Sequence, residues 1–411
     1  MSASMVAEHA KWPAKSDPIF MIAAKAGEAK EKFGADKVIN STLGALIEDD
    51  GSLVAFDSVY ETFKSLDNAL IAAYAPIEGT KDFLEAAEKN CFGENRPKAY
   101  IRSVATPGGT GAVKHAVWNY TNPGDKVLTS DWYWSPYNTI TEEIGRGIET
   151  FELFDRSGSY NIDDLKAKAK KLLASQKRLV IILNTPAHNP TGYSISDEEW
   201  DKILEFFKKE AEDKSKKITI LVDAAYIEFA GEGEERKKFF SKFSGLPENI
   251  FTIVGFSASK GFTMYGLRSG AAIGISSEEK VVEEFFYACL HSGRANWSNG
   301  TRGAMETISK ISKDTELKNR YETEKNKYKK LLRERADAFV KEAEKVDLEL
   351  LPYRDGFFIS IPCGDPEKAS QKLMEKNIFV VPLKKGLRFA VCAVSEEKCK
   401  TAPKEIKEVI K

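Results

Sequence analysis

Short apolar runs alternate with helix-like segments through the middle of the chain, and this alternation limits the possible folds. The runs rich in valine and isoleucine that end at polar or glycine-containing turns are predicted to be buried strands; they span residues 126–129, 178–183, 218–222 and 250–254. Strands that alternate with helices form mainly parallel sheets, which place ligand-binding groups at the carboxyl ends of the strands. The pattern therefore predicts an α/β protein whose functional residues follow its strands.

The segment 256–270, F-S-A-S-K-G-F-T-M-Y-G-L-R-S-G, places a lysine just after one of these strands. If Lys260 turns into a cleft, it loses part of its preference for the charged form and becomes a potential nucleophile toward carbonyl groups. Ser257, Ser259 and Arg268 add hydroxyl groups and a bidentate donor that suit a phosphate. From these residues alone, an ordinary surface lysine is an equally good interpretation.

This segment resembles the lysine signature of the class I aminotransferases, in which Lys260 would hold pyridoxal 5′-phosphate covalently. Further matching segments follow in the family's order along nearly the whole chain. The resemblance implies the α/β fold of type I pyridoxal-phosphate transferases. It has a mainly parallel seven-stranded sheet in a large domain, expected at residues 53–320. A small α+β domain is expected from residues 1–52 and 321–411.

A glycine-rich turn lies in residues 103–120, S-V-A-T-P-G-G-T-G-A-V-K-H-A-V-W-N-Y, and an amphipathic helix follows it. Glycines let the backbone approach a ligand closely, and a helix start offers unpaired N–H groups, so an anion suits this turn. A nucleotide phosphate is an alternative, although the spacing G-x-G-x-x-G is absent. The turn resembles the family's phosphate cup, with Gly108, Gly109 and Thr110 at matching positions. The family often has serine where Gly108 stands.

Two further predicted strands end in segments that match the family. The motif H-N-P-T-G after residues 178–183 resembles the family's asparagine turn, in which Asn189 bonds the cofactor's ring oxygen. The motif D-A-A-Y after residues 218–222 implies that Asp223 pairs with the pyridine nitrogen and Tyr226 with the ring oxygen. A carboxylate there keeps the ring nitrogen protonated, so that the ring accepts electrons from a substrate Cα–H bond. In isolation, the two motifs read as a turn and a helix cap.

Three aromatic residues follow the strand at 126–129 in S-D-W-Y-W-S-P-Y. An aromatic face there would stack on a flat ring, and Trp134 is the best match to the family's stacking tryptophan. Pro136 and Tyr137 stand where the family commonly has an asparagine and a histidine that support the aspartate.

Two segments nearer the N-terminus also match the family. The segment V-I-N-S-T-L-G-A-L resembles a short strand and turn in which the backbone of Gly44 lies near the substrate carboxylate. The segment Y-A-P-I-E-G implies that the Tyr74 hydroxyl reaches the cofactor phosphate of the neighbouring subunit. The resemblance thus implies a homodimer. As isolated residues, Gly44 is a turn glycine and Tyr74 a half-buried packing residue.

Two arginines are candidates for substrate recognition. Arg294 lies in S-G-R-A-N-W-S-N-G, a turn from which the family's arginine reaches across the dimer to the side-chain carboxylate of a dicarboxylic substrate. Relatives that accept aromatic substrates share this arginine. Arg388 lies in G-L-R-F-A-V, where the family places the arginine that binds the substrate α-carboxylate. Between them, residues 313–345 are charged and helical in pattern, and residues 357–361, 378–382 and 387–391 are predicted short strands.

Composition excludes several other classes of protein. A net charge of -1 over 411 residues gives no general attraction to nucleic acid or acidic membranes. The apolar runs fall far short of the roughly 20 residues needed to span a bilayer. The five cysteines and four histidines are scattered, which argues against disulfides and a metal site. We expect a cytoplasmic protein that acts on small molecules.

The predicted activity is transamination between an L-amino acid and a 2-oxo acid by a ping-pong mechanism, most consistent with aspartate and 2-oxoglutarate. Lys260 is expected to act as nucleophile and base, supported by Asp223 and Tyr226. An aromatic aminotransferase, a β-lyase or decarboxylase on the same fold, and a non-enzymatic pyridoxal-binding regulator remain alternatives. The lack of an appended basic DNA-binding domain counts against the regulator.

Overall fold

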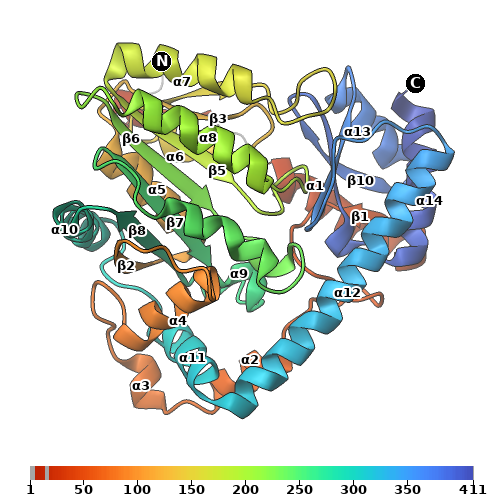
Figure 1. Cartoon of the computed structure of the whole chain (residues 1–411). Helices are drawn as coiled ribbons and strands as arrows, with labels where there is room; N and C mark the ends of the chain where they lie inside the picture. Colours follow the sequence, from red (N-terminus) through yellow and green to blue (C-terminus); the bar gives the residue numbers. More distant parts are fainter. Residues whose placement is uncertain (1–4, 14–17, 411) are drawn as a thin grey trace.

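The computed structural model describes residues 5–13 and 18–410 and contains a large and a small sheet (Figure 1). The large sheet has seven strands. In spatial order they are β2 (Tyr100–Thr106), β8 (Gly270–Ser276), β7 (Ile250–Ser257), β6 (Lys217–Asp223), β5 (Arg178–Asn184), β3 (Lys126–Ser130) and β4 (Gly147–Phe151). Only β8 runs antiparallel to its neighbours in this sheet. The prediction of a mainly parallel seven-stranded sheet is confirmed, and each of the four predicted strands lies within one of its members.

Both faces of the large sheet are buried, which explains why its strands are continuously apolar. In β5, Leu179, Ile181 and Leu183 belong to one core cluster. Val180 and Ile182 belong to the other, because successive side chains of a strand point to opposite faces. Helices α7 (Ile162–Gln176) and α8 (Asp197–Glu210) cover the first face, and α5 (Gly108–Tyr120) and α10 (Glu279–Asn296) cover the second (Figure 1).

Residues from both ends of the chain build the small sheet. Its strands are β1 (Ile39–Ser41), β10 (Ile378–Leu383), β11 (Gly386–Ala390) and β9 (Phe358–Pro362), in spatial order. Its surrounding helices are α1 (Pro18–Phe33), α13 (Pro366–Glu375) and α14 (Glu396–Ile410). The predicted strands at 357–361, 378–382 and 387–391 are thereby confirmed within a residue. The domain boundaries at 52/53 and 320/321 stay a prediction.

Helix α12 (Thr315–Lys345) joins the two parts of the molecule. It begins after Asp314, whose carboxylate accepts hydrogen bonds from the N–H groups of Glu316 and Leu317. One end of α12 packs on α2 (Asp57–Lys64) and α11 (Arg302–Lys313), and the other packs on α14 and η5 (Val391–Ala393). The helical pattern at 313–345 therefore corresponds to this connection, with Lys313 closing the preceding helix.

The remaining elements are short or lie at the edge of the large sheet. They are η1 (Glu8–Ala10), η2 (Ala35–Lys37), α3 (Asn68–Ala72), α4 (Lys81–Phe92), α6 (Pro136–Glu142), η3 (Ile227–Phe229), η4 (Glu235–Phe243) and α9 (Ala258–Gly261). Among the described residues, no helix combines the length and apolar character required to cross a membrane.

Candidate active site

The carboxyl ends of β5, β6 and β7 meet at a cavity of about 170 Å³. Most of the predicted site residues line it: Gly109, Thr110, Trp134, Asn189, Asp223, Tyr226, Ser257, Ser259, Lys260 and Arg268. Parallel strands bring these distant segments together because their carboxyl ends share one edge of the sheet.

Lys260 lies in the single turn of α9, directly after β7. Its ammonium nitrogen donates a hydrogen bond to the carbonyl of Gly44 and lies 5.0 Å from the centre of the Tyr265 ring. Burial lowers the pKa of Lys260 to about 8, and the nearby charges of Arg388 and Arg268 act in the same direction. The neutral, nucleophilic form of this amine is therefore far more populated near neutral pH than that of an ordinary lysine.

Asp223 ends β6 and is buried on the cavity wall. The Tyr137 hydroxyl donates a hydrogen bond of 2.6 Å to its Oδ2, and the Ala225 N–H donates one of 3.3 Å to its Oδ1. Burial raises the pKa of Asp223, while these two hydrogen bonds oppose the rise. Support for the carboxylate is thus present, but a phenol from α6 provides it in place of the family's usual side chains.

The start of α5 and Arg268 form a cradle suited to an anion. Arg268 donates hydrogen bonds to the Ser259 hydroxyl (3.0 Å) and to the Tyr265 carbonyl (2.8 Å). Gly108 has a φ of +70°, and a Cβ at this position would lie 2.8 Å from Nη2 of Arg268. The serine that the family often has would therefore need the end of the Arg268 side chain to shift, and it would stand at a positive φ that favours glycine. The open N–H groups of the helix start, the hydroxyls and the guanidinium favour a phosphate.

Arg388 enters the site from β11 of the small sheet and is 4% exposed. It donates hydrogen bonds to the carbonyl of Thr42 (2.6 Å) and to Oδ1 of Asn189 (3.4 Å). The amide of Asn189 in turn donates to the Tyr226 hydroxyl at 3.5 Å. The candidate site is therefore assembled from both sheets, with a buried guanidinium at the junction that suits a carboxylate.

Gly44 lies close to the same junction. A Cβ there would lie 2.7 Å from the ring of Phe358 and 3.7 Å from the Tyr226 hydroxyl. A side chain would therefore enter the space beside Lys260. Close packing, rather than a positive φ, explains the glycine.

The structure also separates the neighbouring tryptophans. Trp134 lines the cavity, whereas Trp132 is buried where a Cβ on Gly386 of the small sheet would touch it at 2.8 Å. Trp134 is therefore the tryptophan available to stack on a flat ring.

Five predicted site residues do not line the cavity of this single chain. Gly44, Gly108 and Arg388 lie beside residues that do, whereas Tyr74 and Arg294 lie on the exposed surface. Tyr74 is 87% exposed. Arg294 lies in the last turn of α10, is exposed, and donates a hydrogen bond of 2.6 Å to the Ser298 hydroxyl. Their predicted contribution across a dimer interface stays a prediction.

Sequence reasoning missed four residues of the site, namely Asn184, Ala225, Tyr265 and Thr42, and it also missed the contact of Tyr137 with Asp223. Asn184 lines the cavity, accepts a hydrogen bond from the Asn189 N–H (2.6 Å) and donates to the Asp223 carbonyl (2.8 Å). Tyr265 lines it as well, and its hydroxyl accepts from the Leu46 N–H at 3.0 Å. Thr42 supplies the carbonyl that receives Arg388. Asn184 and Tyr265 lie inside segments that match the family, and this position was the only sequence signal that could have identified them as site residues.

The comparisons with known proteins agree with this geometry. A sequence model described as aminotransferase class I and II matches residues 37–406. The tyrosine aminotransferase of Klebsiella pneumoniae is 26% identical over 322 residues, 75% of this chain and 76% of that protein. The aspartate aminotransferase of Pseudomonas aeruginosa is 24% identical over 393 residues, 92% of this chain and 95% of that protein.

Solved structures give the same result. A crystal structure of an aminotransferase from Anaerococcus prevotii has a TM-score of 0.97 and 44% identity, covering 99% of this chain and 100% of that chain. An aromatic-amino-acid aminotransferase from Burkholderia pseudomallei, covalently bound to pyridoxal phosphate, has a TM-score of 0.79 and 21% identity, covering 98% and 99%. Because the sequence model spans most of the chain, this protein belongs to the family of class I and II aminotransferases.

Proposed function

We propose that this aminotransferase transfers the amino group of L-aspartate to 2-oxoglutarate. Its cofactor is pyridoxal 5′-phosphate, which the residues of the cavity fit. The observation that carries the proposal is the buried Lys260, with a pKa lowered to about 8, in one cavity with Asp223 and Arg268.

The proposed cofactor contacts follow from the chemistry of each group. The start of α5 (Gly108, Gly109 and Thr110), together with Ser257, Ser259 and Arg268, would hold the phosphate, because N–H groups, hydroxyls and a guanidinium all donate to it. Trp134 would stack on the ring, Asp223 would hold the ring nitrogen, and Asn189 and Tyr226 would donate to the ring oxygen.

When bound, the cofactor supplies an electron-accepting ring that stabilises the charge left by breaking the substrate Cα–H bond. Arg388 would hold the substrate α-carboxylate with its buried guanidinium and so orient the Cα–H bond toward Lys260. The neutral amine of Lys260 would remove the Cα proton and later return it at the cofactor carbon. Because the first product, a 2-oxo acid, would leave before the second substrate binds, the kinetics would be ping-pong.

The proposed preference for dicarboxylic substrates rests on Arg294. Its guanidinium is exposed at the end of α10, where a partner subunit could receive it, and a carboxylate is its natural ligand. The proposal includes a homodimer in which Arg294 and Tyr74 complete the neighbouring site.

An aromatic amino acid aminotransferase is the second candidate. Curated relatives carry both names at similar identity, for example the aromatic-amino-acid aminotransferase of Escherichia coli, at 26% over 313 residues. The residues around Lys260 would serve both activities, so the two activities differ in which amino donor has the higher kcat/KM.

The test combines Lys260→Ala with a panel of amino donors. With 2-oxoglutarate as acceptor, we expect aspartate to have a higher kcat/KM than phenylalanine or tyrosine. Lys260→Ala should lower kcat by at least about 10³-fold, because it removes the proton-transfer group. Substantial transamination by a folded Lys260→Ala protein would refute the role of Lys260. Turnover of one amino acid without any 2-oxo acid would instead indicate a β-lyase or decarboxylase.

A further inference from the structure

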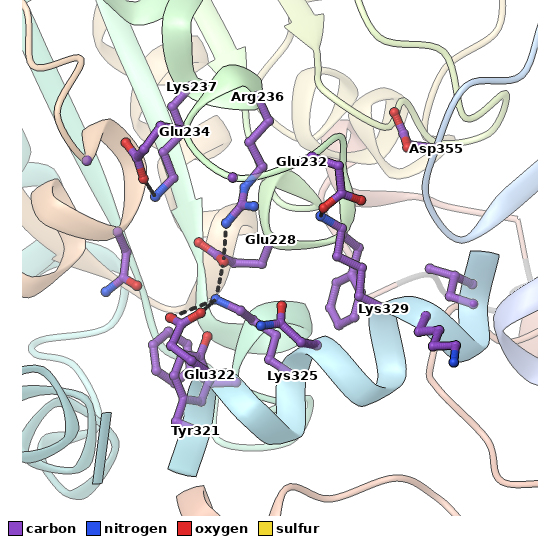
Figure 2. Close-up of a pocket in the computed structure, with 18 of the residues that line it drawn as sticks. Glu228, Glu232, Glu234, Arg236, Lys237, Tyr321, Glu322, Lys325, Lys329 and Asp355 are labelled. Carbon is purple, nitrogen blue, oxygen red and sulfur yellow. Dashed lines mark hydrogen bonds and ion pairs between the residues drawn. The ribbon is translucent and has the colours of Figure 1, made fainter. Parts of the chain in front are cut away.

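A second and larger cavity, of about 1070 Å³, lies on the side of α12 that faces the large sheet (Figure 2). Helix α12 provides one wall, and the ends of α4 and α11 together with η3 and η4 provide the others. Within the described part of the chain, it shares no lining residue with the candidate active site. Neither the family resemblance nor the proposed reaction uses it.

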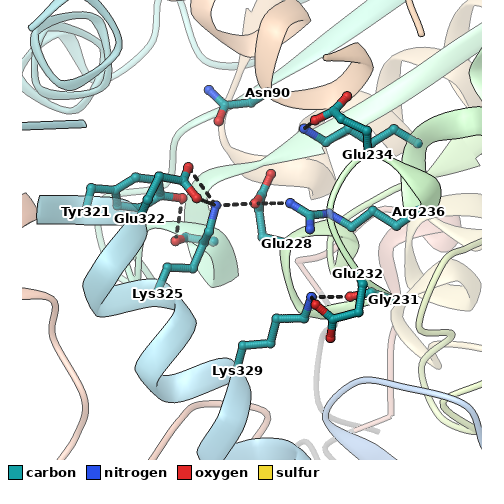
Figure 3. Close-up of polar contacts among 12 residues, drawn as sticks. Asn90, Glu228, Gly231, Glu232, Glu234, Arg236, Tyr321, Glu322, Lys325 and Lys329 are labelled. Atoms are coloured by element: carbon teal, nitrogen blue, oxygen red, sulfur yellow. Dashed lines mark hydrogen bonds and ion pairs between the residues drawn. The ribbon is translucent and has the colours of Figure 1, made fainter. Parts of the chain in front are cut away.

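The floor of this cavity carries an excess of buried positive charge. Lys325 and Arg236 both donate to Oε2 of Glu228, at 2.6 and 3.0 Å (Figure 3). The side chains of Lys325, Lys237 and Arg236 are 3%, 8% and 10% exposed, and that of Glu228 is 5% exposed. These cations hold the pKa of Glu228 at about 2, although burial alone would raise it. One buried carboxylate therefore faces three buried cations.

Glutamates at the rim supply the missing negative charge. Glu322 pairs with Lys325 at 2.9 Å, and Glu234 pairs with Lys237 at 3.5 Å (Figure 2). The side chains of Glu322 and Glu234 are 40% and 47% exposed. Glu234 also accepts a hydrogen bond of 3.0 Å from the exposed Glu94 N–H, which water can satisfy, so either carboxylate can turn into solvent. A carboxylate from a ligand could replace either one without leaving a buried cation unpaired.

The rest of the lining narrows the class of ligand. Eight lysines and arginines and seven aspartates and glutamates line the cavity, so the overall charge is too small to favour a polyphosphate. Apolar side chains also line it, namely Phe229, Phe262, Ile308, Ile311 and Leu332. A short carbon chain with a carboxylate at each end matches both features, because two rim glutamates can be replaced.

We propose that this cavity is a binding site for a small dicarboxylate that regulates the enzyme. Its regulatory part rests on the proposed function of Lys260, whereas binding itself does not. The regulatory link runs through Gly261, which follows Lys260. The Tyr321 hydroxyl donates to the Gly261 carbonyl at 3.0 Å, and a Cβ on Gly261 would lie 2.8 Å from Cγ of Glu228. A ligand that draws Lys325 from Glu228 therefore acts on the backbone beside Lys260.

The test is calorimetric titration of the cofactor-loaded enzyme with succinate, which has no group to be transaminated. We expect two sites per chain in the wild type, one in the active site and one in the cavity. Lys325→Gln keeps an N–H donor for Glu228 but removes the charge, and should weaken the cavity site by at least about tenfold. Lys329→Gln, at the rim, is a second variant in case Lys325→Gln does not fold. Lys341→Gln removes an exposed charge from the same helix and should retain both sites.

Arg388→Leu separates the two proposals. It should abolish succinate binding in the active site and leave binding in the cavity unchanged. If the wild type shows a single site, and this site persists in Arg388→Leu and is lost in Lys325→Gln, the result supports binding in the cavity alone. A single site lost in Arg388→Leu and unchanged in Lys325→Gln and Lys329→Gln would overturn the inference. Regulation is read from the pH midpoint of the cofactor's visible absorbance. Succinate should shift it in Arg388→Leu, and an unchanged midpoint with the cavity occupied would overturn the regulatory part.

Discussion

The surroundings of Lys260 lower the pKa of its amine and so make it more reactive. Its amine is buried, lies within the field of Arg268 and Arg388, and donates a hydrogen bond to the backbone carbonyl of Gly44 rather than to a carboxylate. The charged form is therefore disfavoured, and the folded protein holds this proton less tightly than the unfolded chain does. The same effect that makes the amine reactive reduces the stability of the cofactor-free protein.

Lys260→Met should stabilise the cofactor-free protein in a pH-dependent way. Because folding lowers the pKa of Lys260 from 10.5 to about 8, the wild type carries its full penalty below pH 8 and loses it as the pH rises toward 10.5. The advantage of the variant should be up to about 3 kcal/mol below pH 8 and should vanish near pH 10.5. Denaturant unfolding at several pH values measures it, with Lys341→Met as the exposed control. A pH-independent difference would contradict the lowered pKa.

Tyr137→Phe should weaken the support of Asp223. Removing the 2.6 Å hydrogen bond leaves a buried carboxylate with the Ala225 N–H, so its pKa should rise further and its hold on a protonated ring nitrogen should weaken. We expect kcat to fall about 10- to 100-fold, with a shifted pH titration of the visible absorbance. Tyr133→Phe is the matched control, because the Tyr133 hydroxyl donates to Oδ1 of Asn138 at 3.0 Å rather than to Asp223. Equal effects of both variants would show that the hydrogen bond from Tyr137 to Asp223 is not what supports the reaction.

At the scale of the elements, α12 links the large sheet to the small one, and its start is defined by one side chain. Asp314 accepts from two backbone N–H groups that have no partner within the helix. Tyr321 and Lys325 on the buried stripe of α12 line the second cavity, so this helix also forms one of its walls. The first turn of α12 therefore supports both the link between the two sheets and the wall of the second cavity.

Asp314→Ala should destabilise the protein by about 1 kcal/mol, because two N–H groups lose their acceptor. Asp314→Asn keeps an oxygen acceptor and should retain most of the stability. Thermal and urea unfolding of both variants measures the difference. If the two variants were equally destabilised, the charge of Asp314 would matter and the cap would not.

At the scale of the whole molecule, the two ends of the chain meet in one sheet, and this brings Arg388 to a site built mainly by the other sheet. Tyr74 and Arg294 are exposed on the single chain. In a two-fold symmetric dimer, each subunit presents the same residues to its partner, so both sites would be completed in the same way.

Mixed dimers test whether Arg294 acts across the interface. Subunits with Lys260→Ala and subunits with Arg294→Ala should each be nearly inactive toward aspartate alone. If Arg294 serves the partner's site, one site of each mixed dimer contains both residues, and equal mixing should restore about one quarter of the sites. Aspartate turnover after joint refolding or co-expression measures this. No gain over the separate variants would place Arg294 in the site of its own subunit.

Much of the fold and part of the site could be predicted from local patterns. The strands that end at Asp223 and Ser257 were predictable because apolar, β-branched runs buried on both faces need no knowledge of their partners. The lysine and the glycine-rich turn were predictable because they interrupt those runs. Gly108 was predicted to contact an anion, but its positive φ and its closeness to Arg268, 160 residues away in the sequence, are features of the folded chain.

The strands, the helix after the glycine-rich turn and the reactive lysine at a strand end follow from local sequence, because short-range periodicity and residue chemistry govern these features. The folded chain was needed to see that Tyr137 supports Asp223, that Arg388 contacts Asn189, and that Lys325 and Arg236 share Glu228. These contacts join residues that are far apart along the chain, except for Arg236 and Glu228. Their geometry depends on how helices and sheets pack, which no local pattern encodes.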